Sequence, residues 1–115
     1  MKNQKAIRAR YLRDDPPTRL AGLAANLLRI KSFADRNASH EVVVSLIEES
    51  KHLIEWTAGE FETDMAAQLV ALQVELAGWQ LQWPQVGGDP EARSRVAQQA
   101  ASWSNHVMEM SGLLR

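Results

Sequence analysis

The sequence predicts an all-α protein of 115 residues, folded as a single four-helix bundle. Apolar residues recur at alternating three- and four-residue steps in four separate stretches, and this spacing lines one face of an α-helix. The composition agrees, because 45% hydrophobic and 23% charged residues are typical of globular domains. We expect an up-down-up-down order of helices, preceded by a short basic arm over residues 1–15.

The N-terminal arm is basic, with five Lys or Arg residues and no acid in residues 1–13. It forms either a tail or a short helix that docks Ile7 and Tyr11. A residue before proline avoids helical angles, so Asp15 and Pro16 are expected to be extended. Pro17 suits the first position of the helix that follows. The basic residues of the arm are Lys2, Lys5, Arg8, Arg10 and Arg13.

The first two long helices are predicted over residues 17–36 and 39–58. Asn37 or Ser39 can cap the second helix by accepting a backbone N–H, and Gly59 is a suitable stop. The predicted buried stripe of the first is Leu20, Leu23, Leu27, Ile30 and Ala34, and that of the second is Val43, Ile47, Ser50, Ile54 and Thr57.

The third helix is predicted over residues 61–83, because Pro84 removes a donor and disfavours helical angles at Trp83. The apolar spacing continues without a break past Gly59, through Thr57, Phe61 and Met65. One helix over residues 39–83 is therefore the alternative. Such a helix would favour an intertwined dimer, and we favour the break on length. The stripe of this helix is Met65, Leu69, Leu72, Leu76, Trp79 and Trp83.

The fourth helix is predicted over residues 90–114, opened by Asp89 as cap and Pro90 in the first turn. It follows a turn that contains Gly87 and Gly88. Its stripe is Val96, Ala100, Trp103, Val107, Met110 and Leu114.

Charge is distributed unevenly along the chain. Residues 1–36 carry nine bases and three acids, whereas residues 37–88 carry one base and eight acids. We favour the interpretation that a basic first helix packs against acidic neighbours, in the way that rim charges select partners in coiled coils. The alternative is an exposed arm whose Arg8, Arg10 and Arg13 meet an acidic partner. Nucleic acid is disfavoured as that partner, since the arm lacks interleaved stacking aromatics.

Two residue pairs invite a test for metal chemistry. Glu49 and His52 form a Glu-x-x-His pair, and His106 and Glu109 present the same types in reverse. Carboxylate-bridged di-iron bundles also need a Glu from each of the other helices, and residues 17–36 contain none. At about 100° per residue both histidines fall on outward faces. We therefore predict no metal centre, with Glu49 and His52 as the only candidates for a surface ion.

A second enzyme template is the all-helical nucleoside-triphosphate pyrophosphohydrolase family, whose magnesium site uses a Glu-Glu-x-x-Glu run and a later Glu-x-x-Asp. Glu48 and Glu49 resemble its opening, but His52 stands at the third position and no Glu-x-x-Asp follows. A carboxylate cage for a hard cation is therefore not predicted. The chain has no cysteine, which excludes thiolate metal sites and thiol catalysis. We predict no cofactor.

The four tryptophans divide into two pairs. Trp79 and Trp103 lie on the predicted stripes and are expected in the core. Trp56 and Trp83 lie near predicted helix ends, where an indole either closes the bundle or anchors a partner.

Two segments, YLRDDPPTRL at Tyr11 to Leu20 and ESKHLIEW at Glu49 to Trp56, resemble small all-helical proteins of photosynthetic bacteria. The resemblance covers about a quarter of the chain. It implies an all-helical fold and no assigned activity, so no functional residue is carried over from it.

We therefore predict a non-enzymatic interaction or regulatory module that acts through protein–protein contact or self-association, with a homodimer as one form. The partner-binding candidates are Arg8, Arg10, Arg13, Trp56 and Trp83. The alternative is a small-ligand or divalent-metal-dependent enzyme of a helical-bundle type. No apolar run reaches the ~20 residues of a membrane span, and the N-terminus lacks the apolar core of a secretory signal, so a cytoplasmic location is expected.

Overall fold

Five α-helices and one short 3-10 turn make up the computed structural model, which describes residues 4–36 and 40–113. The described residues contain no β-strand, so the all-helical class is confirmed. The helix count is higher than expected because part of the N-terminal arm is helical. The elements are α1 (Gln4–Tyr11), α2 (Pro16–Asp35), α3 (His40–Thr57), η1 (Ala58–Glu60), α4 (Thr63–Val86) and α5 (Pro90–Ser111).

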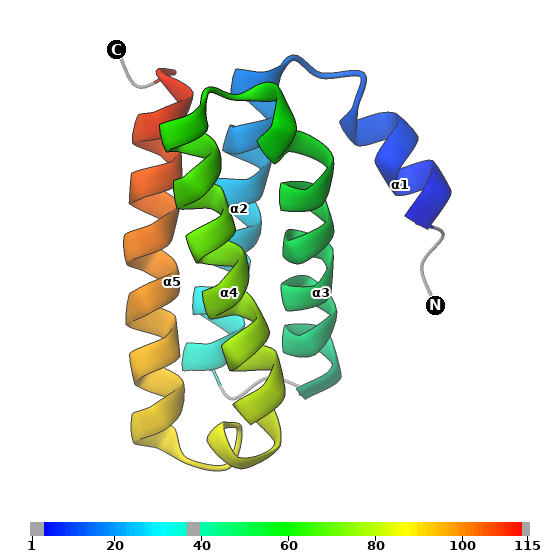
Figure 1. Ribbon diagram of the computed structural model, residues 1–115. Helices are drawn as coiled ribbons and strands as arrows, with labels where there is room; N and C mark the ends of the chain where they lie inside the picture. The colour runs from blue at the N-terminus through cyan, green and yellow to red at the C-terminus, as the bar shows by residue number, and fades with distance from the viewer. Residues whose placement is uncertain (1–3, 37–39, 114–115) are drawn as a thin grey trace.

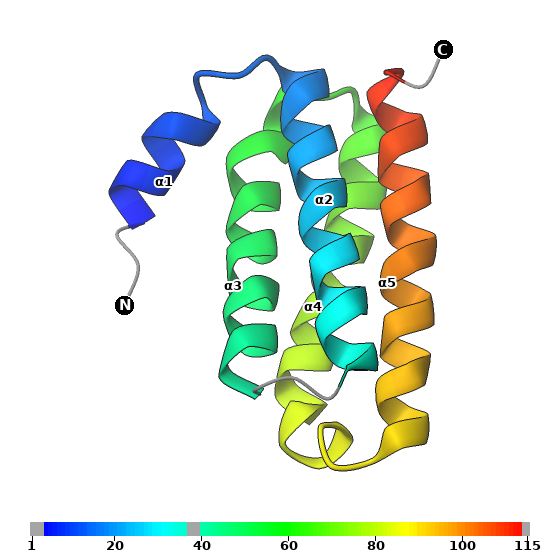
Figure 2. The same ribbon diagram turned by 180° about the vertical axis from the view of Figure 1, so that it is seen from behind.

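The four long helices lie side by side and run alternately down and up (Figure 1). Seen from behind, α2 lies between α3 and α5, and α4 lies on the far side (Figure 2). Helix α2 contacts α3 and α5, while α4 contacts α3, η1 and α5. Helix α1 stands apart from these four, beside α3 (Figure 1). None of the described helices combines the length and the apolar character needed to cross a lipid bilayer.

Side-chain caps begin three of the long helices. The Asp15 side chain accepts a hydrogen bond from Thr18 N at 3.0 Å, and hydrogen bonding with the side chain and the backbone of Thr18 lowers the pKa of its carboxyl group. Asp89 caps α5 through Glu91 N at 3.0 Å. Glu62 caps α4 through Met65 N at 2.9 Å. Each cap satisfies an amide that has no partner within its own helix. The proposed caps Asn37 and Ser39 lie outside the described residues.

Several helix ends differ from the prediction. Helix α2 begins at Pro16, which was expected to be extended, and α4 begins at Thr63, two residues later than expected. Helix α4 continues through Pro84 to Val86, so the expected exit at Trp83 is wrong. A proline in the last turn removes only its own N–H, and Gly87 N still donates to Trp83 O at 2.8 Å. Helix α5 ends at Ser111, ahead of residue 114, because Gly112 adopts the left-handed conformation with φ of 73°. The helix before Gly59 ends at Thr57, followed by η1.

The core forms where the four predicted stripes converge. All five stripe residues of α2 and all five of α3 are buried, and so are Trp79 and Trp83 of α4. The contact between α2 and α5 is the most extensive, because small side chains let these two helices approach closely. Ser104 Oγ donates to Ala24 O across this contact at 2.8 Å. The small buried residues of the pair are Ala24, Ala34, Ala97, Ala100 and Ser104.

A hydrogen-bonded cluster attaches the end of α1 to the bundle. Tyr11 Oη donates to Arg19 O at 2.9 Å and accepts from Thr57 Oγ1 at 3.2 Å. The buried Arg19 side chain donates to Asp14 O at 2.8 Å and pairs with Glu60. The segment that links α1 to α2 is thereby tied to the end of α3 and to η1. This attachment decides where α1 lies relative to α3.

Candidate partner-binding groove

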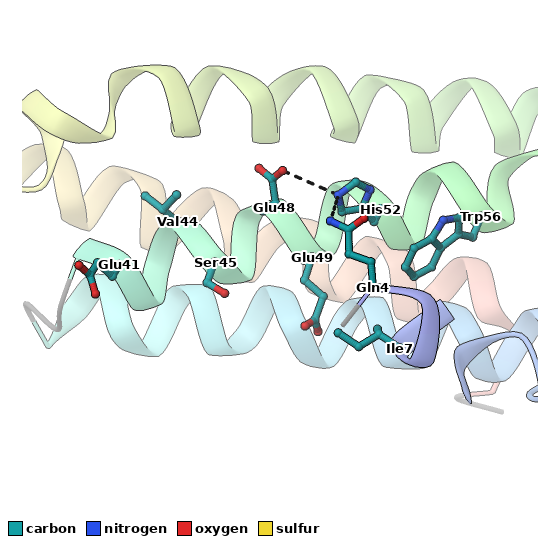
Figure 3. Close-up of a pocket in the computed structure, with 9 residues that line it drawn as sticks. All are labelled: Gln4, Ile7, Glu41, Val44, Ser45, Glu48, Glu49, His52 and Trp56. Carbon is teal, nitrogen blue, oxygen red and sulfur yellow. Dashed lines mark hydrogen bonds and ion pairs between the residues drawn. The ribbon is translucent and has the colours of Figure 1, made fainter. Parts of the chain in front are cut away.

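A groove of about 410 Å³ lies between α1 and α3, and we call it the α1–α3 groove. Two of its lining residues come from α1 and the other seven from the outward face of α3 (Figure 3). Its lining is mixed, with apolar, acidic and imidazole side chains. The residues that line it are Gln4, Ile7, Glu41, Val44, Ser45, Glu48, Glu49, His52 and Trp56.

The α3 wall follows from the helical repeat. Val44, Glu48, His52 and Trp56 recur every four residues, and side chains four apart stack above one another on one face of a helix. The opposite face of the same helix carries the buried stripe, so this row points away from the bundle core. Helix α3 thus has two distinct faces, one packed into the core and one lining the groove.

His52 occupies the end of the groove nearest α1, with 24% of its side chain exposed. Gln4 Nε2 lies 3.0 Å from His52 Nε2, across the space between α1 and α3 (Figure 3). On the other side of the ring, His52 Nδ1 lies 3.3 Å from Glu55 Oε1. Glu48 Oε1 lies 3.7 Å from Nε2. His52 lies on the outward face of α3, as expected, where it also contacts α1 at the edge of the groove.

Trp56 supplies the largest apolar surface in the groove. Its indole stacks on the His52 ring with centroids 5.7 Å apart and planes inclined by 16°. Tyr11 contacts it from the direction of α1, with ring centroids 6.1 Å apart. The indole is half-buried and is therefore held in place while one part of its surface stays open to the groove. Ile7 of α1 and Val44 of α3 are the other large apolar residues of the lining, and we call these three side chains the floor of the groove. Along α3, Glu48 and His52 lie between Val44 and Trp56 (Figure 3).

Helix α1 covers the groove without being packed into the bundle. None of its residues is fully buried, and its half-buried C-terminal Tyr11 is its main attachment. Burial raises the pKa of the Tyr11 hydroxyl to about 12, which marks a well-enclosed anchor. A second hollow of about 260 Å³ lies between α1 and the α2–α3 pair. Hollows therefore lie on two sides of α1.

The groove carries negative charge along α3. Glu41, Glu48 and Glu49 line it, and Lys51 is the only base of that helix. Glu49 Oε2 accepts from Asn26 Nδ2 of α2 at 3.1 Å, and Glu48 Oε2 accepts from Gln80 Nε2 of α4 at 2.6 Å. These hydrogen bonds hold Glu49 against α2 and Glu48 against α4. The two carboxylates point to opposite sides of α3 (Figure 3). The acidic wall is therefore oriented by the neighbouring helices.

The predicted partner-binding residues separate in the structure. Arg8, Arg10 and Arg13 are exposed, and their guanidinium groups form no ion pair among the described residues. Arg10 lines the second hollow, and none of the three lines the α1–α3 groove. Trp56 lies in the groove. Trp83 is 1% exposed in the core beside His40, so its proposed role as a surface anchor is wrong.

The candidates for a surface ion have structural partners instead. Within the described part of the chain, no three His, Asp or Glu side chains come together in a group that could hold a metal. Glu49 bonds to Asn26, and His52 contacts Gln4 and Glu55. His106 is half-exposed, stacks edge-on against Trp103 and contacts Gln68.

Sequence reasoning identified Trp56, His52 and Glu49 but did not bring them together with Ile7 and Val44. The available signal was the four-residue step from Val44 to Trp56, which marks a second face on α3. The contribution of α1 depends on tertiary contacts of Tyr11 that no local pattern encodes. Comparison of the chain with family models, with curated proteins and with solved structures gives no match to any of them.

Proposed function

We propose that this protein is a non-enzymatic protein-binding module whose α1–α3 groove takes an amphipathic helix with apolar and basic side chains. The four long helices act in this proposal as an up-down-up-down four-helix-bundle scaffold. The observation that carries it is an apolar floor of Ile7, Val44 and Trp56 beside an acidic wall, in a groove of about 410 Å³. A helix laid in such a groove would place its apolar face on the floor.

The floor provides the contact surface that helix recognition needs. Partner interfaces are enriched in Trp, and the Trp56 indole is packed against the rings of His52 and Tyr11. A rigid aromatic side chain loses little conformational entropy when a partner packs against it. Trp56 is therefore the proposed centre of the contact.

The charge of the wall selects the chemistry of the partner. Glu41, Glu48 and Glu49 line the groove, so basic side chains on the flanks of a bound helix would be attracted to α3. Helix α1 is itself an example of this chemistry within the chain. It carries Lys5, Arg8 and Arg10, has no acidic residue, and turns Ile7 towards the groove beside α3.

The proposal can be tested with two synthetic helical peptides that share one leucine face. The remaining positions are lysine in one peptide and glutamate in the other, and binding to the full chain is followed by the fluorescence anisotropy of a labelled peptide. We expect the lysine peptide to bind and the affinity to fall as salt rises, because the attraction between exposed charges is screened. Equal binding of both peptides, or binding of neither, contradicts the proposal.

Variants locate the binding surface. Glu41→Gln with Glu48→Gln removes two charges from the groove and is expected to weaken lysine-peptide binding by roughly tenfold, at ~0.7 kcal/mol for each charge. The control is Glu75→Gln with Glu109→Gln, which changes the net charge equally on α4 and α5. Trp56→Ala should weaken binding further. Equal losses in the groove pair and in the control pair would mean that the peptide responds to net charge and not to the groove.

The alternative remains a helical-bundle enzyme that uses a small ligand or a divalent metal. The observation that favours it is the groove volume, which lies within the ~300–1,000 Å³ of small-molecule sites. A bound metal would raise the melting temperature by mass action, and His52→Ala would abolish that rise. A stabilising shift with Mg²⁺, Mn²⁺, Fe²⁺ or Zn²⁺ that depends on His52 would support the enzyme, and no shift would remove its metal-dependent form.

A further inference from the structure

Helix α4 carries a second apolar stripe on the side that faces away from the core. Val70, Val74 and Leu81 are 48%, 69% and 80% exposed. Ala67, Ala71 and Ala77 are exposed on the same side. At about 100° per residue this stripe lies opposite the buried row that runs from Leu69 to Trp83. An α-helix that is apolar on two opposite faces is normally covered on both of them.

The charges and amides of α4 leave this outer stripe bare. Asp64 and Glu75 are the only charged residues of the helix, and neither lies on the stripe. Two of its glutamines turn sideways towards α3, since Gln80 bonds to Glu48 and Lys51 and Gln73 Nε2 donates to Lys51 O at 3.2 Å. On the other flank Gln68 contacts His106 of α5. These polar groups thus hold α4 between its neighbours and are turned away from Val70, Val74 and Leu81, while the exposed Gln85 lies one turn beyond Leu81.

The spacing of the stripe repeats every seven residues. Ala67, Val74 and Leu81 form one series, and Val70 and Ala77 form the second. This is the three- and four-residue alternation by which one helix packs along another. The stripe is therefore suited to a second helix that lies along α4, and it extends over about 21 Å at 1.5 Å per residue.

We propose that the outer face of α4 binds the same face of a second copy of this protein, antiparallel, about a two-fold axis at Val74. In that register Leu81 lies over Ala67 of the second copy, and Val70 lies over Gly78. A Cβ added at Gly78 would meet nothing within 4 Å, so this position leaves room for a bulky side chain. Large residues thus oppose small ones on both sides of the axis. A two-fold contact must have this self-complementarity, which is the reason for choosing a second copy as the occupant.

The size of the surface sets the strength of the dimer. A contact made by one helix pair is smaller than the ~800 Å² per partner of a standard stable interface. We therefore expect a dissociation constant on the order of 10 µM, with monomer and dimer exchanging. The contact is apolar, so sulfate should strengthen it, whereas salt should weaken binding in the α1–α3 groove. The two surfaces lie on different helices, and this inference is independent of the proposed function.

Sedimentation velocity of the full chain, from low micromolar to submillimolar concentration, tests the dimer. We expect the wild-type mass to rise towards twice that of the 12.9 kDa chain and Val74→Lys to remain a monomer at every concentration. Val74→Lys places like charges next to each other at the axis, while the folded monomer tolerates the change because Val74 is exposed. Leu81→Glu should also abolish the dimer. Circular dichroism of both variants establishes that they remain folded.

The control is Leu28→Lys, which replaces an exposed apolar side chain of α2 with the same charged residue; Leu28 is 49% exposed and Val74 is 69% exposed. This variant should dimerise like the wild type. A wild-type protein that stays monomeric throughout overturns the proposal. So does a dimer that is abolished by Leu28→Lys but not by Val74→Lys, since the contact would then lie elsewhere.

Cysteine cross-linking tests the antiparallel register, because the chain contains no cysteine of its own. Under mild oxidation Val74→Cys should form a disulfide between copies. A mixture of Ala67→Cys and Leu81→Cys should give the mixed cross-link in preference to either self-pair. Efficient self-pairing of Ala67→Cys would show a parallel contact and would contradict the proposed register.

Discussion

Tyr11 is the residue that fixes α1 in its position beside α3. Its hydroxyl donates to Arg19 O and accepts from Thr57 Oγ1, and its ring contacts Trp56. One side chain therefore joins α1 to α2, to α3 and to the floor of the groove. The sequence indicated that Tyr11 could dock, but its partners lie in other elements and became known only from the fold.

Ionisation of Tyr11 should make stability fall at high pH. Its pKa is raised from 10.0 to about 12 in the folded protein, so the hydroxyl stays protonated in the native state while the unfolded state ionises. The contribution of protonated Tyr11 to the free energy of unfolding is complete below pH 10, and it is lost as the pH rises from 10 to 12. It amounts to at most about 2.7 kcal/mol at ~1.36 kcal/mol per pKa unit. Urea unfolding measured across this range gives the decline.

Tyr11→Phe is the control for that pH dependence. Tyr11 is the only tyrosine of the chain, so its ionisation can also be followed directly by phenolate absorbance. The variant should be about 1–2 kcal/mol less stable at neutral pH because two hydrogen bonds are lost. The Tyr11-dependent part of the high-pH decline should be absent from it. An identical decline in Tyr11→Phe and in the wild type would show that other groups cause it.

Trp83 shows what sequence reasoning lacked at the residue scale. The predicted helix end at Pro84 placed this indole at the edge of the bundle, and the continuation of α4 to Val86 instead encloses it. Its Nε1 has no hydrogen-bond partner among the described residues, whereas Nε1 of Trp79 donates to Gln99 at 3.0 Å. The Trp83 indole is therefore buried by packing alone. Within the described part of the chain it makes no hydrogen bond that the sequence could have indicated.

At the scale of the element, the buried stripes were predictable because each depends only on local spacing. The stripes of α2 and α3 pack into the core as expected, and all their members are buried. The outer stripe of α4 was missed because one helix was assigned one apolar face. The α1–α3 groove was missed because it depends on where α1 is attached, which is a property of tertiary structure.

Helix α4 should become more stable when Pro84 is replaced by Ala. Pro84 lies inside the helix and is exposed, so the substitution restores a backbone donor without changing the core. In a helix interior Pro is ~3 kcal/mol less favourable than Ala. Because Pro84 lies in the last turn, we expect the free energy of unfolding to rise by only about 1 kcal/mol. The melting temperature should rise by about 4 °C. A lower melting temperature would show that Pro84 contributes more by restricting the unfolded chain.

Helix α1 should open independently of the other four helices. None of its residues is buried, so its unfolding exposes little apolar surface. Hydrogen exchange should therefore show α1 amides at least about 100-fold less protected than the central amides of α2 and α5. Equal protection would mean that α1 unfolds only together with the bundle, and the groove would then be a rigid site.

At the scale of the whole molecule, two surfaces on different helices carry the proposals. The α1–α3 groove combines an apolar floor with acidic side chains, and the outer face of α4 is apolar without charge. The charge is uneven along the sequence, and in the fold the exposed bases lie on α1 while the acids lie on α3 beside it. The two surfaces should respond in opposite ways to salt, so that binding of a partner and self-association can be followed separately.

The most direct measurement is a two-dimensional ¹H–¹⁵N NMR titration of the labelled full chain with the lysine-containing amphipathic peptide. We predict that the Trp56 indole signal and the amides of Ile7, Val44 and His52 shift together and saturate, while the amides of Val70 and Val74 on α4 stay unchanged. Shifts confined to α4 or α5, or no shifts at peptide concentrations well above the protein, would contradict the assignment of the α1–α3 groove as the binding site.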